Sequence, residues 1–117
     1  MLKIYAYKSC DSCRKAIKWL KERELEFEEV AIRETPPSVG ELGKVLAAYD
    51  GELKRLFNTA GGDYREMGMK DKLSGMSDEE ALELLSKNGN LVKRPLVIGK
   101  DVALVGFKVG EWEERVG

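Results

Sequence analysis

The chain has 117 residues, of which 43% are apolar and 35% are charged. This balance is typical of one folded domain with a modest core, and it excludes a disordered chain. Twenty basic and twenty-one acidic residues leave a net charge of −1, so no strong positive field exists to bind a nucleic-acid backbone directly. The sequence contains no histidine, which removes the commonest general base and most zinc sites.

The first residues, MLKIYAYKSC, are too short and too interrupted to form a signal peptide. No apolar run approaches the length of a membrane span. We therefore expect a cytoplasmic protein with no membrane partner. In that compartment a C-x-x-C pair is more often catalytic, redox-sensing or metal-bound than a structural disulfide.

The first thirty residues predict a strand, a helix and a second strand. Apolar residues alternate with polar or aromatic ones over residues 2–7, which indicates a strand. The segment SCDSCRKAIKWLKER follows with apolar residues at helical spacing, so a helix is expected to begin near Ser9 to Asp11. A second strand is expected within residues 27–32. Together these elements form a βαβ unit, whose crossover should be right-handed.

The middle of the chain is expected to be helical. Ser38 with Glu41, and Ser77 with Glu80, form capping boxes ahead of apolar stripes. The segment NTAGGDY between them is expected to be a glycine-rich break. The segment PLVIGKDVALVG has two short apolar runs around a turn, which indicates a β-hairpin, and KVGEWEERVG is expected to add a short final helix. This layout predicts an α/β fold in which a small mixed sheet carries helices on its faces.

Cys10 and Cys13 form a C-x-x-C pair where the predicted first strand passes into the predicted helix. Three interpretations are open: two neighbouring thiols without a shared role, part of a metal site, or a redox pair. Zinc is disfavoured, because two thiolates without histidine leave a tetrahedral shell incomplete. We expect no metal and no cofactor. A redox pair is favoured, because unpaired N–H groups and the helix dipole stabilise a thiolate in the first helical turn.

Helical spacing gives the two cysteines different expected roles. Cys13 lies four residues before Ile17 on the apolar stripe, so it is expected to be the more buried thiol. We therefore expect Cys10 to be the more reactive one and to attack the substrate. Cys13 would then resolve the mixed disulfide from within the protein. Both residues are assigned as catalytic, since one helical turn brings their sulfurs within bonding reach.

Three segments, taken in order, resemble those of a known family. YKSCDSCRKAIKWL is similar to the family's opening. LFNTAGGDYREMGMKDKL resembles its N-T-x-G-x-x-Y-R segment, and LVKRPLVIGKDVALVGFK resembles its R-P-hydrophobic strand and hairpin. Over essentially the whole chain, the sequence resembles the arsenate reductases and their Spx-type relatives. The resemblance implies a single thioredoxin-like domain over residues 1–117, with βαβ and ββα units and a helical insertion spanning roughly residues 38–88.

The resemblance implies two further site residues. Arg94 stands at the position of a family arginine attributed to oxyanion binding, so it is assigned a catalytic role. Pro95 follows it and is assigned to substrate positioning. We predict that the Arg94–Pro95 peptide bond is cis, because thioredoxin-like folds commonly place a cis-proline beside the reactive cysteine.

The same comparison with the family predicts poor activity on arsenate. Two other arginines attributed to oxyanion binding are replaced here, by Ala60 and Phe107. Arginine serves such anions through bidentate, charge-assisted hydrogen bonds, which neither replacement can make. Lys108 and Arg65 are candidate substitutes.

The resemblance leaves two classes of function open. One is a thiol–disulfide oxidoreductase whose partner is a thiol reductant, either glutathione with glutaredoxin or thioredoxin. The other is an Spx-type, redox-sensing transcriptional regulator that binds the α subunit of RNA polymerase. Gly51 lies near a glycine linked to polymerase contact in that branch, although a glycine after a helix is usually a C-cap.

Overall fold

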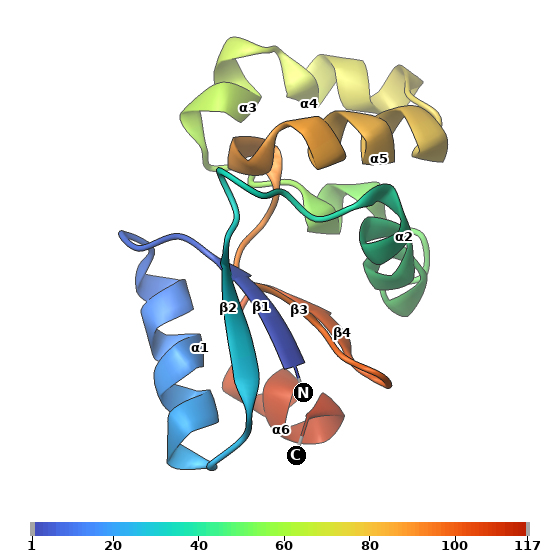
Figure 1. Ribbon diagram of the computed structural model, residues 1–117. Coiled ribbons are helices and arrows are strands. Elements are labelled where there is room, and N and C mark those ends of the chain that lie inside the picture. The colour runs from blue at the N-terminus through green and yellow to red at the C-terminus, as the bar shows by residue number, and fades with distance from the viewer. Residues whose placement is uncertain (1, 117) are drawn as a thin grey trace.

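The computed structural model describes residues 2–116, which form a four-stranded mixed sheet in the order β2–β1–β3–β4 (Figure 1). β1 (Leu2–Ala6) pairs in parallel with β2 (Phe27–Ala31). On its other side β1 pairs antiparallel with β3 (Leu96–Ile98), which pairs antiparallel with β4 (Ala103–Val105). The predicted α/β fold with a small mixed sheet is confirmed.

Helices cover both faces of the sheet (Figure 1). α1 (Asp11–Glu22) and α6 (Val109–Arg115) pack against one face. The chain between β2 and β3 forms a helical block on the other face. Its α-helices are α2 (Val39–Ala48), α3 (Gly62–Glu66), α4 (Met69–Lys72) and α5 (Asp78–Lys87). Short 3₁₀ turns follow α2, α4 and α5, namely η1 (Leu53–Leu56), η2 (Leu73–Gly75) and η3 (Gly89–Leu91).

Two hydrophobic clusters lie on opposite sides of the sheet. Because successive strand residues point to opposite faces, Ile4 and Ala6 join the cluster under α1 and α6, and Tyr5 joins the cluster of the helical block. Trp112 of α6 is fully buried in the first cluster, with Trp19 of α1 at 5.4 Å between ring centroids. The predicted alternation of the first strand therefore determines which of its side chains enter each of the two clusters.

Both predicted capping boxes are present. The Ser38 side chain accepts a hydrogen bond from the Glu41 N–H at 3.1 Å, and the Glu41 carboxylate accepts one from the Ser38 N–H at 3.0 Å. Ser77 and Glu80 make the same reciprocal pair at 3.2 and 3.0 Å. These local signals fix where α2 and α5 begin.

The segment NTAGGDY is a break only in its first half, so that prediction was partly wrong. α3 begins at Gly62, and Tyr64 turns into the core with 7% of its surface exposed. α4 follows and buries Met69 completely. These helices have five and four residues, which is too short for an apolar repeat to be visible in the sequence.

Two glycines occupy positions that a larger residue would strain. Gly51 follows α2 with φ of +79°, and its N–H donates to the Leu46 carbonyl at 2.9 Å. This is the geometry of a helix C-terminal cap. Gly89 is buried, and a β-carbon there would lie 1.9 Å from the Ile32 carbonyl oxygen. Gly89 thus lets the end of the helical block pack directly on the chain after β2.

No helix within residues 2–116 is long and apolar enough to cross a membrane.

Candidate active site

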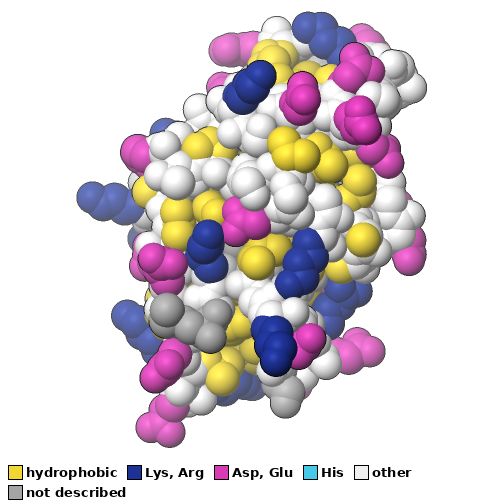
Figure 2. Space-filling view, turned by 45° about the vertical axis from the view of Figure 1, so that its right-hand side comes forward, with side chains coloured by type: hydrophobic (Ala, Val, Ile, Leu, Met, Phe, Trp, Pro, Cys, Tyr) yellow, Lys and Arg dark blue, Asp and Glu magenta, His cyan; other side chains and the backbone are white. Residues whose placement is uncertain are grey.

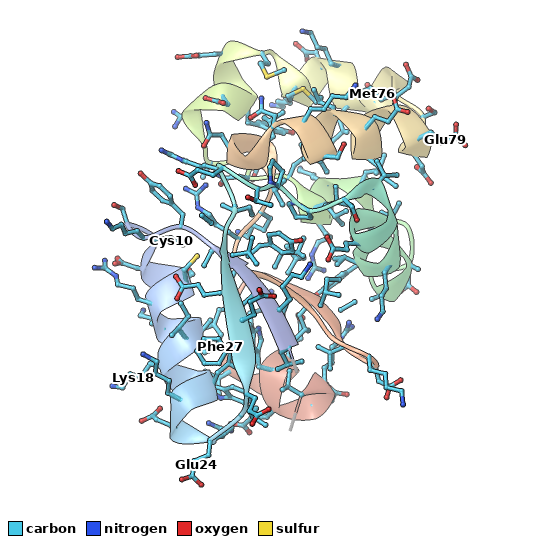
Figure 3. All side chains as sticks on the ribbon, in the orientation of Figure 1. Cys10, Lys18, Glu24, Phe27, Met76 and Glu79 are labelled. Carbon is cyan, nitrogen blue, oxygen red and sulfur yellow. The ribbon has the colours of Figure 1, made fainter. Side chains whose placement is uncertain are left out.

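Cys10 is the N-cap residue of α1. It lies near the end of β1, where the chain enters the helix (Figure 3). Its backbone is extended, and its Sγ accepts a hydrogen bond from the Cys13 N–H at 3.3 Å. The side chain is partly exposed and its thiol is free. The Cys10 sulfur therefore sits at the open end of α1, where an incoming group can reach it.

Cys13 lies one helical turn further on, and only 1% of its surface is exposed. It belongs to the cluster formed by α1, α6 and the sheet. Its Sγ accepts a hydrogen bond from the Tyr7 N–H at 3.5 Å. Burial, and secondarily the neighbouring Cys10, raise the pKa of Cys13 to about 12. The expected difference in burial between the two cysteines is confirmed.

The ring of Tyr7 brings two arginines to this end of the molecule. The Arg94 guanidinium lies 5.0 Å from the centre of the Tyr7 ring. The Arg33 guanidinium lies 3.8 Å from the same centre and donates a hydrogen bond to the Tyr7 hydroxyl at 3.0 Å. The positive charge of Arg94 also opposes the rise in the pKa of Cys13. Tyr7, Arg94 and Cys13 are thus neighbours.

Sequence reasoning missed Tyr7 and Arg33 as members of this group. The sequence pattern places Tyr7 only at the end of the predicted first strand and indicates no role for Arg33. Arg33 follows β2, which lies beside β1 in parallel, so both strands deliver their next residues to the same edge. The parallel pairing of strands in the predicted βαβ unit is the signal that could have indicated this contact, because it places Tyr7 and Arg33 at the same edge of the sheet.

The Arg94–Pro95 peptide bond is cis, as predicted. Pro95 is buried, and its carbonyl accepts a hydrogen bond from the Gly106 N–H at 2.8 Å. This bond ties the start of β3 to the loop that follows β4.

Ala60 and Phe107, the two positions expected to lack oxyanion-binding arginines, have different surroundings. Ala60 is exposed, and its carbonyl accepts a hydrogen bond from the Arg65 guanidinium at 3.0 Å. Phe107 packs edge-on against Trp112, with 5.0 Å between ring centroids. Lys108 follows it and is exposed. Of the two candidate substitutes, Arg65 is hydrogen-bonded to backbone, and Lys108 forms no ion pair among residues 2–116.

Two hollows meet at Arg94. The larger is an open groove of about 390 Å³ that also touches Ser12, Phe107 and Lys108. The smaller is a polar hollow of about 100 Å³ that also touches Arg33. Ser12 lies between the two cysteines, so the larger groove reaches the C-x-x-C segment directly.

Within residues 2–116, no three histidine, cysteine, aspartate or glutamate side chains are grouped so that they could hold a metal ion.

Comparison with known proteins supports the likeness inferred from the sequence. The model of the ArsC family matches residues 5–115. The chain belongs to the ArsC family. The uncharacterized protein YusI of Bacillus subtilis is 46% identical over 114 residues, covering 97% of each chain. The global transcriptional regulator Spx of Enterococcus faecalis is 32% identical, covering 95% of this chain and 83% of Spx.

A solved structure has the same fold over nearly the whole chain. It is an ArsC family related protein from Bacteroides fragilis, with 41% sequence identity, a TM-score of 0.87 and 97% coverage of each chain. This ArsC-family chain therefore has the predicted thioredoxin-like architecture, and its relatives include a transcriptional regulator.

Proposed function

We propose that this ArsC-family protein is a thiol–disulfide oxidoreductase that cycles Cys10 and Cys13 between dithiol and disulfide. One observation carries the proposal: Cys10 is partly exposed at the N-cap of α1, and Cys13 is buried one turn away with its N–H directed at the Cys10 sulfur. An exposed nucleophile backed by a sheltered second thiol is the arrangement that disulfide exchange requires.

The cycle has two exchange steps. The Cys10 thiolate attacks one sulfur of a substrate disulfide, which breaks the substrate S–S bond and releases one substrate thiolate. Cys13 then loses its proton and attacks the Cys10 sulfur, which breaks the mixed disulfide and releases the second substrate thiolate. Both released thiolates take up protons. The substrate gains two electrons and two protons, and the protein ends with a Cys10–Cys13 disulfide.

Burial gives Cys13 its place in this order. Because its pKa is raised to about 12, Cys13 is protonated at neutral pH and does not compete with Cys10 for the substrate. It becomes a nucleophile only when a mixed disulfide on Cys10 stands next to it. A thiol reductant, either glutathione with glutaredoxin or thioredoxin, then returns the protein to the dithiol.

The test uses a neutral peptide disulfide and the pre-reduced protein. The expected result is one equivalent of substrate reduced, with peptide mass analysis locating an intramolecular Cys10–Cys13 disulfide. Adding a thioredoxin or glutaredoxin system with NADPH should give continuous turnover. Substrate that stays oxidised with the intact dithiol would contradict the proposal.

Arsenate should be a poor substrate. Losing one charge-assisted hydrogen-bonding partner costs about 1.5–3 kcal/mol. Ala60 and Phe107 each replace one such arginine, so the combined cost is about 3–6 kcal/mol. At about 1.4 kcal/mol per tenfold, binding or catalysis falls by roughly two to four orders of magnitude. Arsenate-dependent oxidation of NADPH should be near background and should rise in an Ala60→Arg, Phe107→Arg double variant that remains folded. Turnover comparable to that of an arsenate reductase assayed in parallel would contradict this.

An Spx-type regulator is the second candidate, because the chain is 32% identical to a protein of that name. In this candidate the same dithiol senses oxidation and the partner is the α subunit of RNA polymerase. Capture of that subunit by the wild-type protein, lost in Gly51→Arg, would favour it. Because Gly51 has a positive φ, Gly51→Asn is the matched control, since asparagine tolerates that conformation better than arginine.

A further inference from the structure

We propose that the groove beside the C-x-x-C segment binds an acidic segment of a protein whose disulfide is the substrate. This inference rests on the proposed oxidoreductase function and names the class of substrate. The groove's volume of about 390 Å³ lies within the usual range for ligand sites. It begins at Ser12, between the two cysteines, so a chain lying in it can present a disulfide to Cys10.

The groove concentrates positive charge, whereas the chain as a whole is nearly neutral. The whole chain has a net charge of −1, and on the face shown in Figure 2 acidic and basic side chains are interspersed. The groove, by contrast, is lined by one carboxylate, that of Glu52, and by five cations drawn from three separate stretches of chain: Lys54, Arg55, Lys93, Arg94 and Lys108.

Most of these cations are available to a ligand. Arg55 lies 3.9 Å from a Glu111 carboxylate oxygen and is partly neutralised. Among residues 2–116, Lys54, Lys93 and Lys108 form no ion pair, and all three are exposed. A groove lined by unpaired charge of one sign attracts a ligand of the opposite sign and raises its rate of association.

The floor of the groove adds an apolar contribution. Phe57, Val105 and Phe107 contribute to its lining. An extended acidic segment can place its carboxylates on the surrounding lysines while its backbone and apolar side chains cover this floor. The buried second thiol, Cys13, means that no small thiol is needed to resolve the mixed disulfide, so the substrate disulfide can belong to a protein.

The experiment compares three peptides that carry the same intramolecular disulfide and differ only in flanking residues: glutamates, glutamines or lysines. The pre-reduced protein is mixed with each, and the rate of Cys10–Cys13 disulfide formation is followed by acid quenching and mass analysis. At low ionic strength we expect the acidic peptide to react about tenfold faster than the neutral one and the basic peptide more slowly. The preference should shrink as salt screens the charges.

Two double variants with the same change in net charge test whether the preference for the acidic peptide arises in the groove. Lys93→Glu with Lys108→Glu should abolish or reverse the preference for the acidic peptide. Lys18→Glu with Lys21→Glu changes two exposed residues of α1, and Lys18 projects from that helix well away from Cys10 (Figure 3). This control should keep the preference. An equal loss in both double variants would overturn the inference, because it would assign the effect to net charge.

Two other outcomes separate the inference from the proposed function. If the neutral peptide oxidises the dithiol but the three peptides react at equal rates, the groove inference fails and the oxidoreductase stands. If no peptide oxidises the dithiol, both fail. Oxidised glutathione and cystamine complete the set as anionic and cationic small disulfides. Discrimination between them as large as that between the peptides would overturn the claim that the ligand is a protein segment.

Discussion

The two faces of the sheet bury different kinds of core. Under α1 and α6 the core consists of aliphatic side chains, two tryptophans and the thiol of Cys13. Under the helical block, two buried tyrosines direct their hydroxyls to carboxylates, Tyr5 to Glu41 at 2.6 Å and Tyr49 to Glu111. The first core shields the Cys13 thiol from water. The second anchors a helical block, and with it one wall of the groove, at defined positions on the sheet.

The largest expected effect comes from the α1–α6 core. Trp112 is fully buried and contacts both Trp19 and Phe107 edge-on. Trp112→Ala should lower the free energy of unfolding by about 3–5 kcal/mol, because it removes this burial and leaves a cavity. Urea denaturation followed by circular dichroism measures the loss. A loss below about 1 kcal/mol would show that α6 contributes little to this core.

A smaller loss is expected where the helical block meets β4. The Tyr49 hydroxyl accepts a hydrogen bond from the Val105 N–H at 3.1 Å and donates one to Glu111. Tyr49→Phe leaves the buried Val105 N–H without a partner, so stability should fall by about 1–3 kcal/mol. Tyr7→Phe is the comparison, since among residues 2–116 the Tyr7 hydroxyl bonds only the exposed Arg33 side chain. Equal losses in the two variants would contradict the anchoring role of Tyr49.

The smallest effect concerns Glu41 and depends on pH. Burial raises the pKa of Glu41, but hydrogen bonds from Tyr5, Ser38 and Lys3 together outweigh it, so the pKa lies below its ordinary value of 4.5. A lowered folded-state pKa contributes stability above the ordinary value, and this contribution is lost as pH falls through the folded-state pKa. Glu41→Gln should therefore cost about 1 kcal/mol at neutral pH and progressively less in acid.

Urea denaturation of both proteins from neutral pH down to about pH 3 checks this prediction. Glu80→Gln is the matched control, because Glu80 forms the same capping box and has no tyrosine or lysine partner in the described part of the chain. Its effect at neutral pH should be smaller than that of Glu41→Gln. A cost of Glu41→Gln that does not change with pH would show that its charge is not what stabilises the fold.

Features set by neighbouring residues could be predicted from the sequence, and features set by distant residues could not. The capping boxes of Ser38 and Ser77 depend on side chains three residues apart, so their pattern is visible in the chain. The alternation over residues 2–7 likewise predicted a strand whose successive residues lie on opposite sides. The Tyr7–Arg33 contact depends on the parallel register of two strands rather than on neighbouring residues. The groove joins segments still further apart in the sequence, and no local pattern encodes which side chains meet there.

The cysteine pair was predictable in part, because some of its features depend on neighbouring residues and others on distant ones. Helical spacing predicted that Cys13 would be the more buried thiol, and its 1% exposure confirms this. The hydrogen bond from the Tyr7 N–H to the Cys13 sulfur depends on how the end of β1 is placed beside α1. The sequence does not specify that placement, so only the structure shows this bond.

The most direct test of the account traps the first exchange step. The variants Cys13→Ser and Cys10→Ser are each reduced, mixed with the neutral peptide disulfide and analysed as intact proteins by mass spectrometry. The account predicts that Cys13→Ser accumulates a mixed disulfide on Cys10, because attack can occur but resolution cannot. Cys10→Ser should stay unmodified, because its remaining thiol is buried and protonated. A mixed disulfide that forms faster on Cys13 than on Cys10 would contradict the assigned roles.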